Sequence, residues 1–395
     1  MGISLGLVGL GAFGSEFAPL FMSHPLVDRV ALCDREPERI ARFARDPSFQ
    51  AKFNPNDAYS SLEDICKARL DALVIMTQYW LHAPQAIQAM ESGKHVYSAV
   101  PLITLPDADE MLGWCDKIVR ACQRTGMKYM LGETTYFRPQ TMYCRRQAAA
   151  RAFGDFVYAE GEYFHPHDWK LADLREVKKN RFASSSGREW TRILDSYTRR
   201  GIRQTPMTYP THSTSGPISV MKAHALKVSA FGYTSRSNDD YFDDHHFSNV
   251  TALYQMSNGT SMRVCEFREL TYPSSESFEM EIFRLFGTNG SFRENRWGDK
   301  DNWHPLTVQE MRDPLPPEVA DAFRRQCGEK NMLGGHGGSH AYLVNEFVEA
   351  VARNRPPAIN AWEAARYMAA GCAAHLSALR DGELVNVPDW GDAPA

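Results

Sequence analysis

The first third of the chain alternates short apolar runs with amphipathic, helix-like stretches. Continuous apolar runs of this length are typical of parallel strands buried on both faces, and the stretches between them are long enough for crossover helices. The apolar runs lie at residues 4–10, 29–33, 71–77, 95–98 and 128–132, and the helix-like stretches include 82–92 and 107–125. The pattern predicts a doubly wound α/β domain over residues 1–135.

The pattern changes after residue 150. Residues 156–164 alternate apolar and polar side chains, and two Asn-Gly turns, at 258–259 and 289–290, lie between further candidate strands. Asn-Gly is the strongest short hairpin signal, and alternation is typical of an antiparallel sheet with one open face. We therefore expect an open antiparallel sheet in the second half of the chain.

The end of the chain returns to helical periodicity at residues 340–354 and 361–382. We expect an α+β domain for substrate binding and oligomerisation over residues 136–395, with these last helices packing back on the first domain. The polar, basic stretch 166–208 lacks strand signals, and we interpret it as a long functional loop with some helix.

Composition narrows the class of protein. The length of 395 residues favours two domains, and a formal charge of −4 gives no basic footprint for nucleic acid. No apolar run is long enough for a transmembrane helix, and the chain begins on a strand without a signal-peptide pattern. The eight cysteines form no C-x-x-C pair. We expect a cytoplasmic protein with reduced thiols and no membrane partner.

The strongest local motif is Gly9-Leu10-Gly11-Ala12-Phe13-Gly14, which follows the first strand and opens a helix. Glycines in this spacing permit the turn, the approach of a pyrophosphate and close helix packing in a Rossmann domain. Asp34 ends the second strand, where a carboxylate binds ribose hydroxyls and repels a 2′-phosphate. The motif predicts NAD, although Arg35 beside Asp34 is compatible with NADP.

Several polar side chains follow later strands. The third strand runs into Thr77, Tyr79, Trp80 and His82, at the edge where a dinucleotide binds. Tyrosine and histidine suit proton transfer near neutral pH, and the candidates are Tyr163, Tyr209, His212 and His336. His165 and His340 are interpreted as structural. The run "DDHHF" at 243–247 is not interpreted as a metal site, because consecutive residues cannot all point at one ion.

The glycine motif, Asp34, the segment 93–102, the later sheet and the closing helix resemble the Gfo/Idh/MocA oxidoreductases over nearly the whole chain. In that family the fourth strand ends in Glu-Lys-Pro, and its lysine relays a proton from the substrate hydroxyl. Here the positions are Ala99-Val100-Pro101. Thr208 also stands where the family has an aspartate, four residues before His212.

These departures are similar to one branch, the NAD-dependent glycosidases such as α-N-acetylgalactosaminidases and sulfoquinovosidases. That branch has Glu-Val-Pro in the strand and a Tyr-Pro-Thr-His motif, which is present here at 209–212. Segments 160–165 and 336–338 resemble its substrate tyrosine segment and its later loop. Segment 131–136 resembles another, with Glu133 in place of an asparagine that contacts NAD.

The resemblance implies a glycoside hydrolase with tightly bound, recycled NAD. The sugar would be oxidised transiently at carbon 3, lose its carbon 2 proton, eliminate the leaving group, add water and be reduced again with net retention. The implied catalytic residues are His212, Tyr163, Tyr209 and, more weakly, Tyr136. The implied cofactor contacts are Gly9, Gly11, Ala12, Phe13, Gly14, Asp34, Arg35, Thr77, Tyr79, Trp80, His82, Ala99, Val100 and Glu133.

The substrate is expected to be a small sugar glycoside. The basic stretch suggests an anionic sugar such as a sulfoquinovoside, and a solvated or subunit-facing loop is the alternative. The expected substrate contacts are Tyr163, Lys170, Lys179, Arg192, Tyr209, Thr211, His212 and His336. Two other functions stay open: an NAD-dependent sugar or cyclitol dehydrogenase, and a non-catalytic sugar or redox sensor. The open sheet favours a homo-oligomer, a dimer or tetramer.

Overall fold

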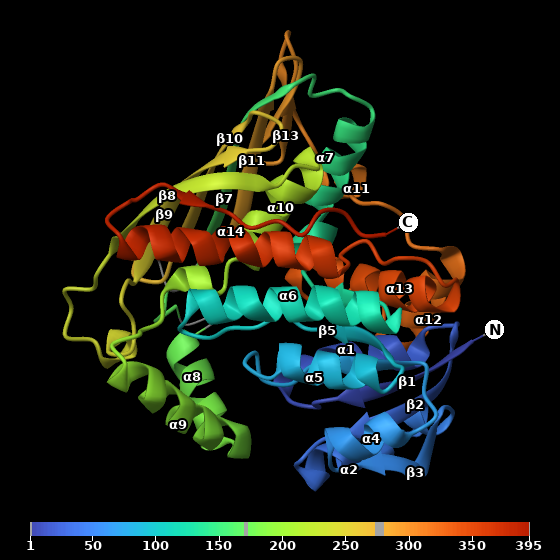
Figure 1. The fold of residues 1–395 in the computed structure, drawn as a ribbon. Coiled ribbons are helices and arrows are strands. Elements are labelled where there is room, and N and C mark those ends of the chain that lie inside the picture. The colour runs from blue at the N-terminus through green and yellow to red at the C-terminus, as the bar shows by residue number, and fades with distance from the viewer. Residues whose placement is uncertain (1, 170–172, 273–279, 395) are drawn as a thin grey trace.

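The computed structural model describes residues 2–169, 173–272 and 280–394. A six-stranded parallel sheet in the order β3-β2-β1-β4-β5-β6 forms the first domain (Figure 1). Its strands are β1 (Ile3–Val8), β2 (Val27–Cys33), β3 (Phe53–Tyr59), β4 (Ala72–Ile75), β5 (His95–Ser98) and β6 (Tyr129–Leu131). This is the strand order of a Rossmann sheet, so the predicted fold class is confirmed.

Helices α1 (Ala12–Ser23), α5 (His82–Glu91) and α6 (Ala108–Thr125) lie where the sequence predicts them. Three shorter helices were not placed by the sequence: α2 (Pro37–Ala44), α3 (Pro47–Gln50) and α4 (Leu62–Lys67). Asp107 caps α6 by accepting from the N–H groups of Asp109 and Glu110, and Gly126 ends it with a left-handed φ of 69°. Strand β3 was not predicted. It is a polar edge strand that contains Pro55 and exposes much of its surface, so it lacks the apolar pattern.

The second sheet has nine strands in the order β14-β13-β12-β11-β7-β10-β9-β8-β15. They are β7 (Phe156–Phe164), β8 (Ala225–Tyr233), β9 (Asn249–Met256), β10 (Ser261–Phe267), β11 (Glu281–Gly287), β12 (Ser291–Arg293), β13 (Arg296–Gly298), β14 (Trp303–Pro305) and β15 (Val385–Asn386). Both predicted hairpins form, β9–β10 and β11–β12. Neighbouring strands are antiparallel except β7 and β10, which run parallel.

The segment 166–208 is largely helical, which corrects the prediction of a long loop. It contains α8 (Leu174–Ala183) and α9 (Ser185–Arg199), whose first turns are capped by the side chains of Asp173 and Ser184. The other helices are α7 (Pro139–Ala149), α10 (Thr211–Met221), α11 (Val308–Met311), α12 (Pro317–Cys327), α13 (Ser339–Ala352) and α14 (Ala361–Leu379). Short 3-10 turns are η1 (Thr135–Phe137), η2 (Pro206–Thr208), η3 (Asp240–Phe242) and η4 (His336–Gly338).

Helices α10 and α14 join the two halves of the molecule. Figure 1 shows α14 lying along α6 of the first domain, with the second sheet behind it. All eleven residues of α10 are buried. The helix lies so close to β7 that a Cβ on Gly161 would stand 1.9 Å from the Ser213 carbonyl oxygen. Gly161 therefore fixes the distance between α10 and the sheet.

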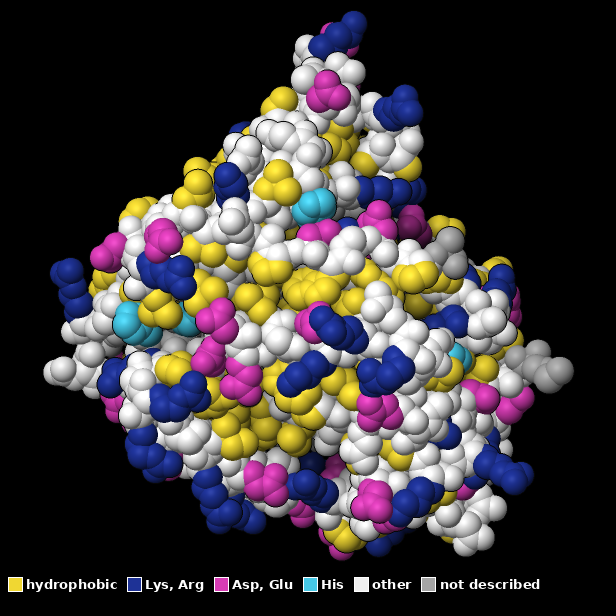
Figure 2. Space-filling view, viewed as in Figure 1, with side chains coloured by type: hydrophobic (Ala, Val, Ile, Leu, Met, Phe, Trp, Pro, Cys, Tyr) yellow, Lys and Arg dark blue, Asp and Glu magenta, His cyan; other side chains and the backbone are white. Residues whose placement is uncertain are grey.

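On the face shown in Figure 2, lysine and arginine side chains are intermixed with aspartate and glutamate. Within the described residues, no helix combines the length and the apolar character needed to cross a bilayer.

The close approach at Gly161 gives a stability prediction. Gly161→Ala should lower the free energy of unfolding by about 1–3 kcal/mol, because α10 or β7 must shift to admit the methyl group. Gly113→Ala on α6 is the matched control, since its Cβ meets no atom within 4 Å and alanine is the better helix former. Urea denaturation of both variants measures the difference, and equal stabilities would contradict the packing argument.

Candidate active site beside helix α10

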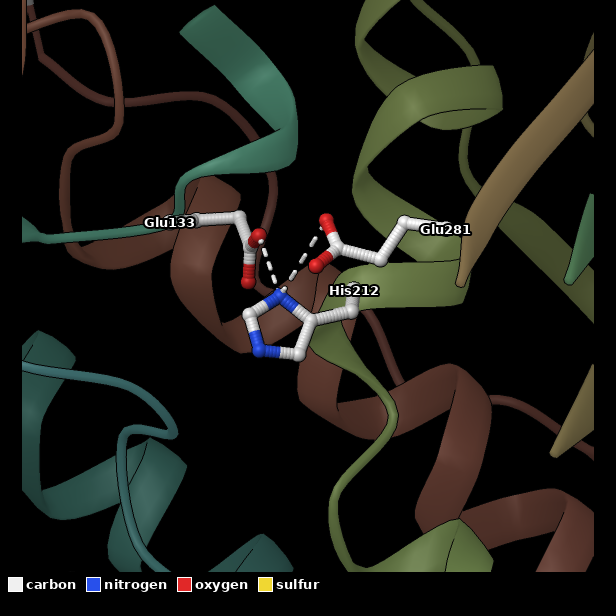
Figure 3. A group of neighbouring side chains, drawn as sticks. All are labelled: Glu133, His212 and Glu281. Atoms are coloured by element: carbon white, nitrogen blue, oxygen red, sulfur yellow. Dashed lines mark hydrogen bonds and ion pairs between the residues drawn. The ribbon is translucent and has the colours of Figure 1, made fainter. Parts of the chain in front are cut away.

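A buried polar cluster surrounds His212, the second residue of α10. Figure 3 shows Glu133, from the segment after β6, and Glu281, from the start of β11, on the same side of the imidazole ring. His212 Nδ1 lies 2.9 Å from Glu133 Oε1 and 3.8 Å from Glu281 Oε2. Nε2 lies on the other side of the ring, away from both carboxylates.

Both carboxylates are held by the same short segment. The Thr135 N–H donates to Glu133 Oε1 at 2.9 Å, and the Thr135 hydroxyl donates to Glu281 Oε2. Arg138 Nη2 forms an ion pair with Glu281 Oε1 at 2.7 Å. Because these contacts come from η1 and the residue after it, the cluster is a fixed part of the fold.

The carboxylates set the charge of the histidine. Burial alone would lower the pKa of His212, but the charges of Glu133 and Glu281 outweigh burial and raise it to about 9. Burial likewise opposes ionisation of Glu281, yet Arg138 and His212 hold its pKa down to about 2. At neutral pH the structure therefore favours an imidazolium beside the ionised carboxylate of Glu281.

Two tyrosines face the histidine ring. The ring centroid of Tyr163, on β7, lies 4.9 Å from that of His212, and Tyr209, just before α10, lies at 5.5 Å. The Tyr163 hydroxyl is 2.8 Å from Nδ1 of His165, and the Tyr209 hydroxyl donates to the Val100 carbonyl at 3.2 Å. Burial raises the pKa of both phenols, so both stay protonated and act as hydrogen-bond donors.

Packing requires two glycines of the first-strand motif, and the third leaves room for a dinucleotide. Gly9 has a φ of +91°, and a Cβ there or on Gly14 would stand 2.7 Å or 2.1 Å from a backbone oxygen. A Cβ on Gly11 would meet only Arg39 Nη1, at 3.8 Å. Gly11 also precedes α1 without a side-chain cap, so the first N–H groups of the helix are available to phosphate oxygens.

Asp34 is fixed at the end of β2. Its Oδ2 accepts from the Leu10 N–H at 2.7 Å, and its Oδ1 accepts from the Glu36 N–H at 2.9 Å. Arg39 Nη1 lies 3.5 Å from Oδ2. The carboxylate is thus oriented beside the glycine turn, where the ribose of a bound NAD would lie, and these residues fit the cofactor.

Family comparisons agree with this geometry. Residues 3–133 match the sequence model of the oxidoreductase family with an NAD-binding Rossmann fold, Gfo/Idh/MocA, and residues 281–393 match the C-terminal domain of glycosyl hydrolase 109. The first domain of the chain belongs to the Gfo/Idh/MocA family. Within this family, its two domain matches support the NAD-dependent glycosidase branch.

Two curated relatives point to the same branch. A glycosyl hydrolase family 109 protein of Parabacteroides distasonis is 22% identical over 438 residues, covering 98% of this chain and 86% of that protein. An alpha-N-acetylgalactosaminidase of Tannerella forsythia is 22% identical over 355 residues, covering 81% of this chain and 70% of its own.

Solved structures of Gfo/Idh/MocA oxidoreductases share the fold of the whole chain. An aldose-aldose oxidoreductase from Caulobacter crescentus superposes with a TM-score of 0.71 at 16% identity, covering 98% of this chain and 100% of that one. A myo-inositol 2-dehydrogenase from Lactobacillus plantarum gives 0.68 at 14% identity, with coverage of 98% and 100%. At such low identity the likeness concerns the fold alone.

The segment after β4 is held against helix α9. His82 lies between the carbonyl oxygens of Pro101, at 2.8 Å, and Thr77, at 3.1 Å. Trp80 stacks on Trp190 of α9, with centroids 4.6 Å apart and planes 8° apart. Trp190 is fully buried. The strand end that a dinucleotide would contact is therefore covered by α9.

Some predicted site residues lie elsewhere. Arg35 forms an exposed ion pair with Glu189 at 3.1 Å, and Lys179 pairs with Glu176 on the outer surface of α8. Arg192 is exposed on α9. The Tyr136 ring lies 3.8 Å from Arg145 Cζ instead of facing His212. Lys170 lies outside the described residues.

Other predicted residues are near the cluster. His336 is close enough for its pKa, lowered by burial, to respond to the charges of Glu281 and His212. Its Nδ1 is 2.9 Å from Nε2 of His340, which stacks on Phe17 in the first domain. Thr211 is buried directly before His212.

Glu281 and Arg138 were not predicted. Both are far from His212 in sequence and belong to no motif quoted for the family. The one sequence signal was that Glu281 shares a face of β11 with the apolar residues Phe283 and Leu285.

The His212 cluster predicts a pH dependence of stability. The pKa of His212 is about 9 in the folded protein and 6.5 in the unfolded chain, so its stabilising contribution is complete below pH 6.5 and is lost as pH rises through 9. One proton bound only by the folded state gives a slope of about −1.4 kcal/mol per pH unit. Between pH 7 and 8.5 both pKa values are close enough to reduce the slope to about −1 kcal/mol per pH unit, which urea denaturation should show relative to His212→Asn; parallel curves would refute it.

Proposed function

We propose that the protein is an NAD-dependent glycoside hydrolase that oxidises its sugar transiently and reduces it again. The observation that carries the proposal is the pairing of an apolar strand end, Ala99-Val100, with a buried proton-exchanging centre at His212. Tyr209 connects the two, because its hydroxyl bonds Val100 and its ring faces His212. The glycosyl hydrolase 109 match of the second domain supports the same function.

When bound, NAD supplies a hydride acceptor that later returns the hydride. Gly9, Gly11 and Gly14 would hold its pyrophosphate, and Asp34 would bind the adenosine ribose. His212 would exchange the proton of a ring hydroxyl or of carbon 2 through Nε2, the nitrogen that the carboxylates do not face. This assignment needs no carboxylate nucleophile.

The tyrosines would position the sugar. Tyr163 and Tyr209 keep their protons because burial raises the pKa of each phenol, so they donate hydrogen bonds to sugar oxygens. A tyrosinate base in the resting protein is therefore disfavoured. His336 would line the same pocket from η4.

An anionic sugar remains part of the proposal, with Arg181 of the same basic stretch as the cation in place of Lys179 or Arg192. Arg181 of α8 lies with Cζ 4.2 Å from the Tyr79 ring, and its charge acts on the pKa of Tyr209. Among the described residues it has no carboxylate partner. A sulfonate or carboxylate on the sugar would complete its charge pairing.

The contacts of helix α9 with the first domain explain how the cofactor would be retained. Ser185 donates to Glu36 at 3.1 Å and Arg35 pairs with Glu189, both directly after Asp34. At the strand end after β4, Trp190 of the same helix stacks on Trp80. Helix α9 thus spans the edge of the Rossmann sheet from the adenosine end to the strand end after β4. We propose that this cover keeps NAD bound between turnovers.

The exposed side of the second sheet supports self-association. Phe231 and Leu253, on the adjacent strands β8 and β9, are 65% and 54% exposed. A second copy of the chain would cover these apolar side chains. We propose a cytoplasmic homo-oligomer built on this face.

A glycosidase assay without added NAD tests the function. Purified protein should release nitrophenol from p-nitrophenyl glycosides, offered as neutral and anionic sugars, while no net NADH accumulates. His212→Asn should lose at least a hundredfold in kcat, as general acid–base groups typically contribute that much, with its NAD content unchanged. Stoichiometric NADH formation with free sugars would instead establish the dehydrogenase.

The α9 cover is tested through NAD retention. Trp190→Leu should lose most of its co-purified NAD on desalting and rebind it roughly tenfold or more weakly, equivalent to about 1.4 kcal/mol. NAD content is measured chromatographically on denatured protein, and a melting curve confirms that the variant is folded. Trp303→Leu on β14, in the sheet remote from α9, is the control. Equal retention in both variants would remove α9 from NAD binding.

A further inference from the structure

We propose that Glu133 is a positioning residue that fixes the tautomer and orientation of His212, with Glu281 as a second, supporting carboxylate. The role of His212 in sugar chemistry rests on the proposed function, but the arrangement of the pair does not. Glu133 would act only through the histidine, holding Nδ1–H so that Nε2, on the side of the ring away from the carboxylates, exchanges the proton.

The hydrogen bond at Nδ1 defines the tautomer. Glu133 Oε1 accepts from the Thr135 N–H, and an oxygen that acts as an acceptor there places the proton of its 2.9 Å contact with His212 on Nδ1. Figure 3 shows both carboxylates converging on this one nitrogen. Nε2 is then the nitrogen that gains and loses a proton during a reaction, as in other histidines oriented by a carboxylate.

The partners of the buried charges single out Glu133. Glu281 is paired with Arg138 at 2.7 Å, and the neighbouring buried Glu266 is paired with Arg268 at 2.9 Å. Glu133 is 0% exposed, and within the described residues its ion pair is with His212 alone. A buried carboxylate requires a counter-charge, and the imidazolium of His212 supplies it.

Position 208 does not supply this carboxylate. Thr208 stands where the family resemblance expects an aspartate, and its hydroxyl donates to the Thr205 carbonyl at 2.7 Å. Thr208 also accepts, through its own carbonyl, a bond from Thr104 at 2.9 Å. The residue is thus committed to local structure, and the acid beside His212 comes from β6 and β11 instead.

Titration of His212 reports on this pair directly. The titratable groups that face or act on the histidine from the surrounding elements are Glu133, Glu281, Glu266, Tyr163, Tyr209 and His336. Of these, Glu133 is the nearest carboxylate, so its neutralisation should produce the largest change. Glu133→Gln keeps the size of the side chain and an oxygen acceptor while removing the charge.

The experiment uses NMR of histidine-labelled protein, in which the His212 signal is the one missing from His212→Asn. In Glu133→Gln, His212 should titrate at least about one pH unit lower than in the wild type, and the Nδ1–H tautomer should lose its preference. Glu266→Gln is the matched control. It removes another buried carboxylate that has no direct contact with His212, and a smaller change is expected.

Kinetics add a readout that separates positioning from binding. With any glycoside that the wild type cleaves, Glu133→Gln should lower kcat by roughly tenfold to a hundredfold, with less than about threefold change in KM and in NAD content. The apparent pKa that His212 contributes to the kcat profile should move in the same direction as the NMR titration. Because NMR needs no turnover, a failure of the glycosidase proposal leaves this result interpretable.

Two outcomes would overturn the proposal. One is a His212 titration and tautomer in Glu133→Gln that match the wild type. The other concerns a metal ion, because ligand atoms of Glu133, His212 and Glu281 all lie within 4.8 Å of one another. If the wild type binds about one equivalent of Mn²⁺ or Zn²⁺ tightly and Glu133→Gln does not, the counter-charge of the Glu133 carboxylate is a metal ion and not the imidazolium of His212.

Discussion

A carboxylate without access to water has to be neutralised, and Glu133 imposes that requirement on the centre of this molecule. The side chain is fully buried where β6 leaves the Rossmann sheet, and the positive charge that meets it is the ring of His212. Helix α10 can bring that ring so close because Gly161 lets it rest almost on the backbone of β7. The absence of a side chain at Gly161, in the second sheet, thus lets His212 reach Glu133 at the end of the parallel sheet and take up its charge.

The same charge pairing links the two domains through η1. Thr135 bonds Glu133 with its backbone and Glu281 with its hydroxyl, and Arg138 completes the neutralisation of Glu281. These contacts connect the end of the parallel sheet to the first residue of β11. The two domains are therefore joined by a polar junction that cannot rearrange without leaving a charge unpaired.

The sequence was most informative where one residue type is required by its own backbone. Gly9 has a φ of +91°, and a Cβ on Gly14 would stand 2.1 Å from the Gly9 carbonyl oxygen, so no other residue type fits at either position. The motif and the Rossmann fold could therefore be predicted together. His212 could be predicted from its motif, but its partners Glu281 and Arg138 are brought in by tertiary folding. Glu133 was predicted to contact NAD; its hydrogen bond to His212 could not be read from a local pattern.

Helix α9 shows where a signal was present and was outweighed by composition. Trp190, Leu194 and Tyr197 recur at helical spacing and form its buried face, yet the charged residues between them suggested a loop.

The stacked Trp80–Trp190 pair bears on function as well as on folding. A dehydrogenase that exports electrons has to release its reduced cofactor in every cycle, so a buried cover over the cofactor edge would slow it. An enzyme that returns the hydride to its own substrate has no such exit step, and for it the same cover prevents loss of the cofactor. Under the proposed function, the packing of α9 would thus keep the cofactor in place while the hydride leaves and returns.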